Sequence, residues 1–174
     1  MKVACVQMNS GDDVSENVAK ACRYIEHASG KGADLVVLPE FFNTIFFAQF
    51  WDKKYFALAE SESGYTLSEI RKAAQRFNIA VIATFYEMEA PGLYFDTAFH
   101  VGADGAILHK YRKVHPAGVL SLEKIYFRYG SNFGTYAFND WRVGIGVCYD
   151  MAFPETARSL AANGAELLIA PYAT

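Results

Sequence analysis

The chain contains 174 residues, of which 52% are hydrophobic and 20% are charged, and this composition fits one globular domain over residues 1–174. Its formal net charge of −3, without a long run of either sign, excludes the basic surface of a protein that binds nucleic acid or a membrane surface. No apolar stretch reaches the length of a membrane span, and we expect no signal peptide, because the segment after Met1 reads as a strand.

The first third of the sequence predicts a strand, a helix and a second strand. A strand over residues 2–8 is followed by apolar residues at helical spacing over 14–28, where two glycines end the helix. Residues 34–38 form a short apolar run typical of a buried strand, which stops at Pro39.

A capping box at Thr66 and Glu69 predicts the start of a second helix. The elements that follow are a helix to about residue 77, a strand over 79–86, a hairpin of strands over 97–101 and 106–111, a strand over 141–147, a helix from Pro154 to 163–164 and a last strand over 166–170. One hairpin interrupts the alternation of strands and helices, so the pattern predicts an α/β protein with a mixed sheet.

The three cysteines are odd in number and widely spaced, which argues against a disulfide framework. They predict a reducing compartment, and therefore a cytoplasmic protein. The four histidines lack the spacing of metal ligands, so we expect no metal site.

Three reactive side chains lie at or just beyond the ends of predicted strands: Glu40, Lys113 and Cys148. In α/β folds, catalytic groups gather at the carboxyl ends of strands. These three side chains can therefore meet in space, although they are far apart in the sequence.

Cys148 follows two glycines, which permit a tight bend and close approach by neighbouring groups. A thiol between a strand and a helix lies in a positive local field, which stabilises the thiolate. The alternative is a buried core cysteine, an interpretation that fits Cys5 and Cys22 better, because they lie in a strand and on the apolar face of a helix.

Glu40 and Lys113 also have simpler interpretations. A carboxylate after an apolar strand is costly to bury without a partner, so Glu40 is either functional or a solvated residue at a strand end. Lys113 lies in a basic cluster over residues 111–115, which is also typical of a surface turn.

Together the three side chains make chemical sense. A carboxylate can take the proton of a thiol and later activate water. A nearby lysine restrains that carboxylate and stabilises the oxyanion formed when sulfur attacks a carbonyl group. The backbone N–H of Tyr149 is a candidate second donor to the oxyanion.

Three motifs resemble those of the nitrilase superfamily of carbon–nitrogen hydrolases. They are the glutamate motif Leu38-Pro39-Glu40, the lysine motif Lys110-Tyr111-Arg112-Lys113-Val114-His115 and the nucleophile motif Gly146-Val147-Cys148-Tyr149-Asp150. Their order and rough separation match the family, and the resemblance covers nearly the whole chain.

The resemblance implies an α-β-β-α sandwich and a thiol-acyl mechanism without a cofactor, in which Glu40, Lys113 and Cys148 form the triad. It also implies that Glu123 lies in the pocket and orients Lys113 or the substrate amine; the alternative is an exposed glutamate on a helix. The segment 122–127 and the aromatic run over 41–47 look most like the N-carbamoyl amine and N-carbamoyl amino acid amidohydrolases. Those enzymes act on small amide or carbamoyl substrates and form homo-oligomers. The alternative interpretation of the aromatic run is core packing.

Members of this family are considerably longer than this chain. We therefore expect the final strands and the C-terminal extension to be absent here, as in a fragment, a split product or a chain completed by another chain.

Two other functions stay open. A Cys-His pair with His115 as the base would also activate Cys148, although the residues after Cys148 are larger than in a tight nucleophile elbow. A non-catalytic assembly or binding protein would keep the fold and lose turnover.

Overall fold

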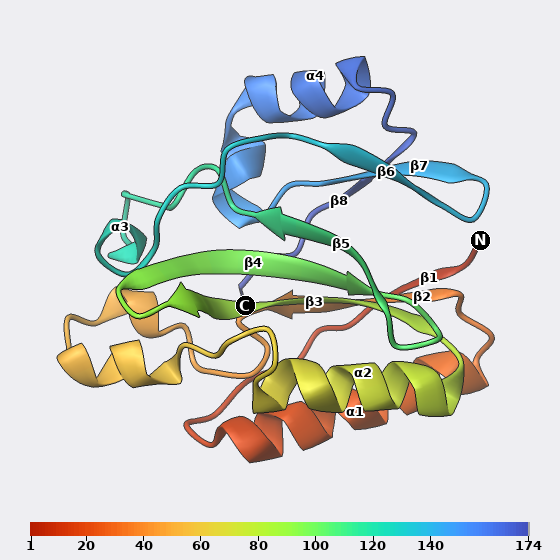
Figure 1. Ribbon diagram of the computed structural model, residues 1–174, viewed down its shortest axis with the longest axis horizontal. Coiled ribbons are helices and arrows are strands. Elements are labelled where there is room, and N and C mark those ends of the chain that lie inside the picture. Colours follow the sequence, from red (N-terminus) through yellow and green to blue (C-terminus); the bar gives the residue numbers. More distant parts are fainter. Residues whose placement is uncertain (174) are drawn as a thin grey trace.

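The computed structural model describes residues 1–173, which form two mixed β-sheets between layers of helices (Figure 1). The first sheet has the order β1-β2-β3-β4-β5 and the second has the order β6-β7-β8. The strands are β1 (Val3–Cys5), β2 (Leu35–Glu40), β3 (Ala80–Ala90), β4 (Leu93–Val101), β5 (Ile107–Arg112), β6 (Thr135–Phe138), β7 (Trp141–Ile145) and β8 (Leu167–Ile169). The helices are α1 (Val14–Gly30), α2 (Tyr65–Phe77), α3 (Glu123–Tyr126) and α4 (Pro154–Ala162), with 3₁₀ turns η1 (Phe47–Gln49), η2 (Lys53–Leu58) and η3 (Cys148–Ala152).

Helices α1 and α2 lie together against one face of the first sheet (Figure 1). The side chain of Asp13 begins α1 by accepting hydrogen bonds from the N–H groups of Ser15 and Glu16. Asn78 ends α2 in the left-handed conformation, which asparagine tolerates better than most residues.

The other face of the first sheet packs against the second sheet, and α4 lies on the far side of the second sheet (Figure 1). Strand β2 serves both interfaces: Val36 and Leu38 join the core beneath the helices, whereas Leu35 and Val37 join the core between the sheets. This burial of both faces explains the continuous apolar run of β2, and the layers make the α-β-β-α sandwich that the family resemblance implied.

Strand β2 continues through Pro39 instead of stopping there. Val37 pairs with Ile82 and Glu40 pairs with Thr84, so Leu38 and Pro39 together oppose one residue of β3. This bulge accommodates a proline, which has no N–H for the ladder. It also moves Glu40 from the helix-covered face to the face shared with Val37, toward the second sheet.

Two other sequence predictions were wrong. The described residues contain three hairpins rather than one, because β3 pairs with β4 and β6 pairs with β7 in addition to the expected β4–β5 pair. Thr66 does not cap α2, whose N-cap is Gly64; instead, the side chain of Glu60 accepts the Thr66 N–H at 2.7 Å.

No helix within residues 1–173 is both long enough and apolar enough to cross a membrane.

Candidate active site

Glu40 lies at the end of β2 and is 2% exposed. Its Oε1 atom lies 2.7 Å from Lys113 Nζ, and its Oε2 atom accepts the backbone N–H of Ala173 at 2.9 Å. Phe41 follows with a φ of 55°, a left-handed conformation that turns the chain sharply after the carboxylate. Both carboxylate oxygens thus have donors, which excludes the interpretation of Glu40 as a solvated residue.

Lys113 follows β5 directly, and its side chain is fully buried. Three carboxyl groups surround its Nζ atom: Glu40 at 2.7 Å, Glu123 at 2.8 Å and Asp96 at 3.3 Å. Burial alone would lower the pKa of Lys113, but the neighbouring carboxyl groups of Asp96, Glu40 and Glu123 outweigh it and hold the pKa above its usual value. Lys113 is therefore a buried ammonium group, and the surface-turn interpretation is wrong.

Glu123 begins the one-turn helix α3 and is 1% exposed, so it is not an exposed glutamate on a helix. Its Oε2 atom contacts Lys113 Nζ and also accepts the N–H of Ala117 at 2.8 Å. Burial raises the pKa of Glu123, and the Lys113 ammonium opposes that effect. Glu123 thus fixes the position of the Lys113 ammonium group, and it ties α3 to the segment after β5.

Cys148 is the first residue of η3 and has a φ of 45°. Its N–H donates to the carbonyl of Pro171 at 2.9 Å, which fixes the turn against the segment after β8. Gly146 permits the close packing here: a Cβ at that position would lie 3.0 Å from the Met151 sulfur and 3.1 Å from a Thr156 methyl carbon, so these side chains would have to shift. The half-buried thiol is therefore held in a strained, closely packed turn.

The electrostatic environment of Cys148 differs from the sequence expectation. Burial, followed by the negative charge of Glu40 and a hydrogen bond to it, raises the pKa of the thiol to about 12, although Lys113 acts in the opposite direction. The expected positive field at the start of a helix is thus outweighed by a buried carboxylate. The raised pKa favours the neutral thiol of Cys148 over the thiolate at neutral pH.

The two other cysteines differ in their burial. Cys22 is partly buried and packs against the core beneath the helices, as expected. Cys5 is exposed, so the prediction that it is a core cysteine was wrong.

Asp150 joins the turn at Cys148 to the segment around Lys113, a role that the sequence analysis missed. This fully buried carboxylate accepts the Tyr111 hydroxyl at 2.7 Å, the Val147 N–H at 2.9 Å and the His115 N–H at 2.8 Å. The position of an aspartate two residues after Cys148, in a short turn, was the available signal. The contacts of Asp150 hold the ends of β5 and β7 in one arrangement.

His115 directs Nδ1 toward Asp150 at 2.9 Å and stacks on Phe153 with ring centroids 4.0 Å apart. The charged groups that act on Cys148 are Glu40, Lys113 and Glu123. This arrangement favours Glu40 over His115 as the base.

The aromatic run after Glu40 forms part of a buried cluster. Phe41 and Phe47 are at most 2% exposed and pack on Phe127 with ring centroids 5.6 and 5.9 Å apart. Tyr149 packs its ring edge-on against Phe153 at 5.3 Å, and its backbone N–H lies in the first turn of η3. Phe41 and Phe47 are therefore packed in the core, whereas Phe46 is only partly buried and lines a small pocket beside Glu40.

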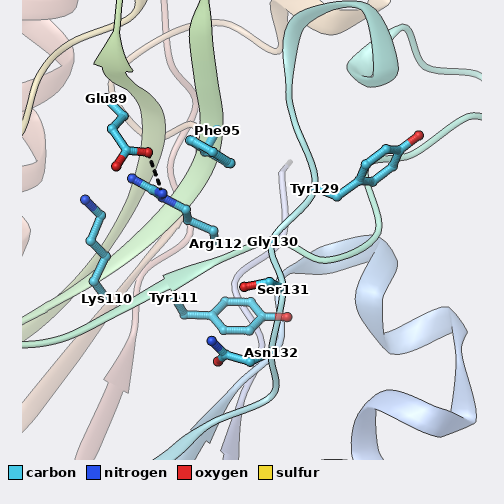
Figure 2. A pocket seen from close by; sticks show the side chains of 9 residues that line it. All are labelled: Glu89, Phe95, Lys110, Tyr111, Arg112, Tyr129, Gly130, Ser131 and Asn132. Atoms are coloured by element: carbon cyan, nitrogen blue, oxygen red, sulfur yellow. Dashed lines mark ion pairs between the residues drawn. The ribbon is translucent and has the colours of Figure 1, made fainter.

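A pocket of about 450 Å³ lies along the outer part of β5 and does not include Glu40, Lys113 or Cys148 (Figure 2). Its charged groups are paired: Arg112 lies 2.6 Å from Glu89, as Figure 2 shows. Residues 1–173 contain no cluster of ligands suited to a metal ion.

Comparison with known proteins identifies relatives along the whole chain. The profile of the family described as "Carbon-nitrogen hydrolase" matches residues 2–174. The chain is 37% identical to a citrullinase of Francisella tularensis, covering 99% of this chain and 61% of that protein. It is 34% identical to an N-carbamoylputrescine amidase of Solanum tuberosum, covering 98% of this chain and 58% of that protein.

Solved structures agree on the fold. A mutant of an amidase from Nesterenkonia sp. AN1 superposes with a TM-score of 0.89 and 27% identity, covering 99% of this chain and 64% of that chain. That structure carries the acetamide moiety of fluoroacetamide, covalently added at the active-site cysteine. The chain described here spans about three fifths of the length of the curated relatives that it matches.

Proposed function

Because the chain belongs to the carbon–nitrogen hydrolase family, we propose that it hydrolyses a linear amide or an N-carbamoyl amine through a cysteine thiol-acyl intermediate. One observation carries this proposal. A thiol, a carboxylate and an ammonium group from three separate strand ends share one buried cluster, in which Lys113 Nζ lies 2.7 Å from Glu40 and both groups act on the Cys148 thiol.

In the proposed first step, Cys148 Sγ attacks the carbonyl carbon while Glu40 takes the thiol proton. A resting thiol with a pKa of about 12 needs such a base at the moment of attack. The Lys113 ammonium and the N–H of Tyr149 stabilise the oxyanion that forms on the carbonyl oxygen. Glu40 then gives its proton to the leaving nitrogen, and the C–N bond breaks to leave a thioester.

In the second step, Glu40 takes a proton from water, and the resulting hydroxide attacks the thioester. The tetrahedral intermediate collapses with loss of Cys148 Sγ, which recovers the proton. An amide gives a carboxylic acid and ammonia or an amine; a carbamoyl amine gives the amine, carbon dioxide and ammonia. Throughout, Glu123 orients Lys113 through their 2.8 Å contact.

The substrate class is proposed from the relatives. Proteins named citrullinase and N-carbamoylputrescine amidase align with 99% and 98% of this chain. Both names describe compounds with a carbamoyl group on nitrogen, so we propose small carbamoyl amines or amino acids ahead of simple amides. We also propose that residues 1–174 form a single domain and that the protein is cytoplasmic. We further propose that it is a homo-oligomer, and size-exclusion chromatography with light scattering tests this oligomeric state.

The second candidate is a catalytically impaired binding or assembly protein with the same fold. It is favoured by the length of the relatives, because 39% and 42% of their chains lie outside the alignment (100 − 61 and 100 − 58) and could contribute to the substrate pocket.

Mass spectrometry separates the two candidates. Incubation with fluoroacetamide, or with N-carbamoyl amines during turnover, should leave an adduct on Cys148 that Cys148→Ala lacks and that Cys22→Ala retains. A folded protein that forms no adduct and releases no ammonia from any carbamoyl amine or amide would support the binding candidate and reject the hydrolase.

A further inference from the structure

Asp96 lies near the start of β4, is 1% exposed, and was not identified from the sequence. It occupies the same face of the first sheet as Ala98, which packs between the two sheets. The Lys113 N–H donates to the Asp96 carbonyl at 2.9 Å, and Lys113 Nζ lies 3.3 Å from Asp96 Oδ2. Asp96 is thus the third carboxyl group of the catalytic cluster.

The three carboxyl groups differ in their hydrogen-bond donors. Glu40 has a donor for each oxygen, and Glu123 Oε2 has two donors, from Lys113 and Ala117. Neither side-chain oxygen of Asp96 has a hydrogen-bond donor among the described residues, apart from the longer ionic contact with Lys113. Because a buried, ionised carboxylate without hydrogen-bond donors is unstable, Asp96 is the least stable of the three in its ionised form.

The total charge of the cluster also indicates that Asp96 is the group that keeps its proton. Three ionised carboxylates around one ammonium group would leave a buried net charge of −2. Carboxyl groups that share a buried site do not all ionise at neutral pH, and the proton goes to the group with the fewest donors.

We propose that Asp96 is a positioning residue that stays protonated and donates its O–H to Glu40, which keeps Glu40 ionised as the acceptor of the Cys148 proton. The second half of this statement rests on the proposed function. Burial, followed by the charge of Glu40 and a side-chain hydrogen bond between Asp96 and Glu40, raises the pKa of Asp96 well above its usual value, and Lys113 opposes them only in part. A neutral Asp96 also leaves Lys113 shared between two carboxylates instead of three, with more of its charge available to an oxyanion.

The protonation state of Asp96 depends on all the titratable groups around it. Glu40 comes from β2, Lys113 follows β5, Glu123 lies on α3 and Cys148 begins η3. The Tyr111 hydroxyl, which Asp96 also influences, is held by Asp150 and stays a neutral phenol.

Infrared spectroscopy tests the location of the proton without turnover. The unmutated chain labelled with ¹³C-carboxyl aspartate should give a protonated-carboxyl C=O band at neutral pH that shifts with the label. The band should vanish in Asp96→Asn and persist in Cys148→Ala. No labelled band at neutral pH would overturn the proposal, even if Asp96→Asn failed to fold.

The rate of Cys148 alkylation by iodoacetamide, measured against pH, tests the charge. Asparagine replaces a neutral acid with a neutral amide, so the midpoint for Asp96→Asn should stay within about 0.3 pH unit of the unmutated chain. If Asp96 were ionised, its loss would remove a negative charge beside the thiol and lower the midpoint by about one unit or more.

Asp96→Leu keeps the cluster neutral at this position but removes the donor to Glu40. It should lower kcat roughly tenfold to a hundredfold with KM little changed, the effect of losing one hydrogen bond to a charged group. If no substrate is ever turned over while the infrared band and alkylation profile are as expected, the proposed function fails and the assignment of the proton stands.

Discussion

Replacing Glu40 with glutamine should change catalysis and thiol reactivity in opposite directions. Glutamine keeps the shape of the side chain but loses the negative charge. Its NH₂ group must also face one of two donors, Lys113 Nζ or the Ala173 N–H, which lie 2.7 and 2.9 Å from the carboxylate oxygens. Loss of a general base costs about 10²–10⁴ in rate, so kcat/KM on a carbamoyl amine or amide should fall by that factor.

The thiol should respond differently. Glu40 raises the pKa of Cys148 both by its charge and by a hydrogen bond, whereas Lys113 lowers it. With Glu40 neutral, burial is the main effect that still opposes Lys113, so the pKa should fall below about 12. Each unit of that fall increases the thiolate fraction at pH 8 about tenfold. Cys148 in Glu40→Gln should therefore react faster with iodoacetamide, although turnover of the proposed substrate should be slower.

The assay follows alkylation of Cys148 by intact-protein mass spectrometry between pH 7 and pH 10, alongside ammonia release from substrate. Glu62→Gln is the matched control, because Glu62 is an exposed carboxylate whose partner, Lys110, lies outside the cluster. Slower alkylation of Glu40→Gln, or unchanged turnover, would refute the reasoning that one carboxylate both suppresses and activates the thiol.

Three further outcomes are expected. Lys113→Met leaves buried carboxyl groups without their cation and should lower the free energy of unfolding by about 3 kcal/mol in urea titrations, whereas Lys54→Met, at an exposed ion pair, should leave it nearly unchanged. Asp150→Asn loses charge-assisted acceptors for three donors and should cost about 2 kcal/mol by the same measurement; an unchanged value would contradict the role of Asp150 as the link between β5 and η3. The folded-state pKa of Cys148, about 12, lies above its ordinary value of 9.0, so stability should be full below pH 9 and should fall as pH rises from 9 toward 12; thermal melts of Cys148→Ala should show a smaller loss over that range.

The reactive side chains could be found from the sequence because each lies at or just beyond the end of a strand. Glu40, Lys113 and Cys148 stood out as polar residues at the ends of apolar runs, and the motifs around them supplied their order. Glu123 came only from the resemblance, since a short polar helix carries no periodic signal. Apolar periodicity also predicted α1, and the start and stop signals of helices predicted α2 and α4, within a few residues.

The features that the sequence analysis missed depend on contacts between distant segments of the chain. Asp96 was missed because the predicted strand began at residue 97, so the alternation that buries Asp96 with Ala98 was not applied to it. The raised pKa of Cys148 comes in part from a carboxylate 108 positions earlier in the chain (148 − 40), which a local field argument does not include. Thr66 was taken for a cap because its true partner, Glu60, lies outside the capping pattern.

The single turn of α3 joins two parts of the molecule that would otherwise vary separately. Glu123 at its start contacts Lys113, and Tyr126 at its end donates its hydroxyl to the carbonyl of Phe50 at 2.7 Å. A substitution that changes the size of an aromatic side chain over residues 47–56 should therefore shift α3, and with it the position of the Lys113 ammonium group. Substitutions over residues 47–56 and in α3 should therefore occur together in related sequences. A chimaera that exchanges only one of these segments should fold but hydrolyse the proposed substrate more slowly.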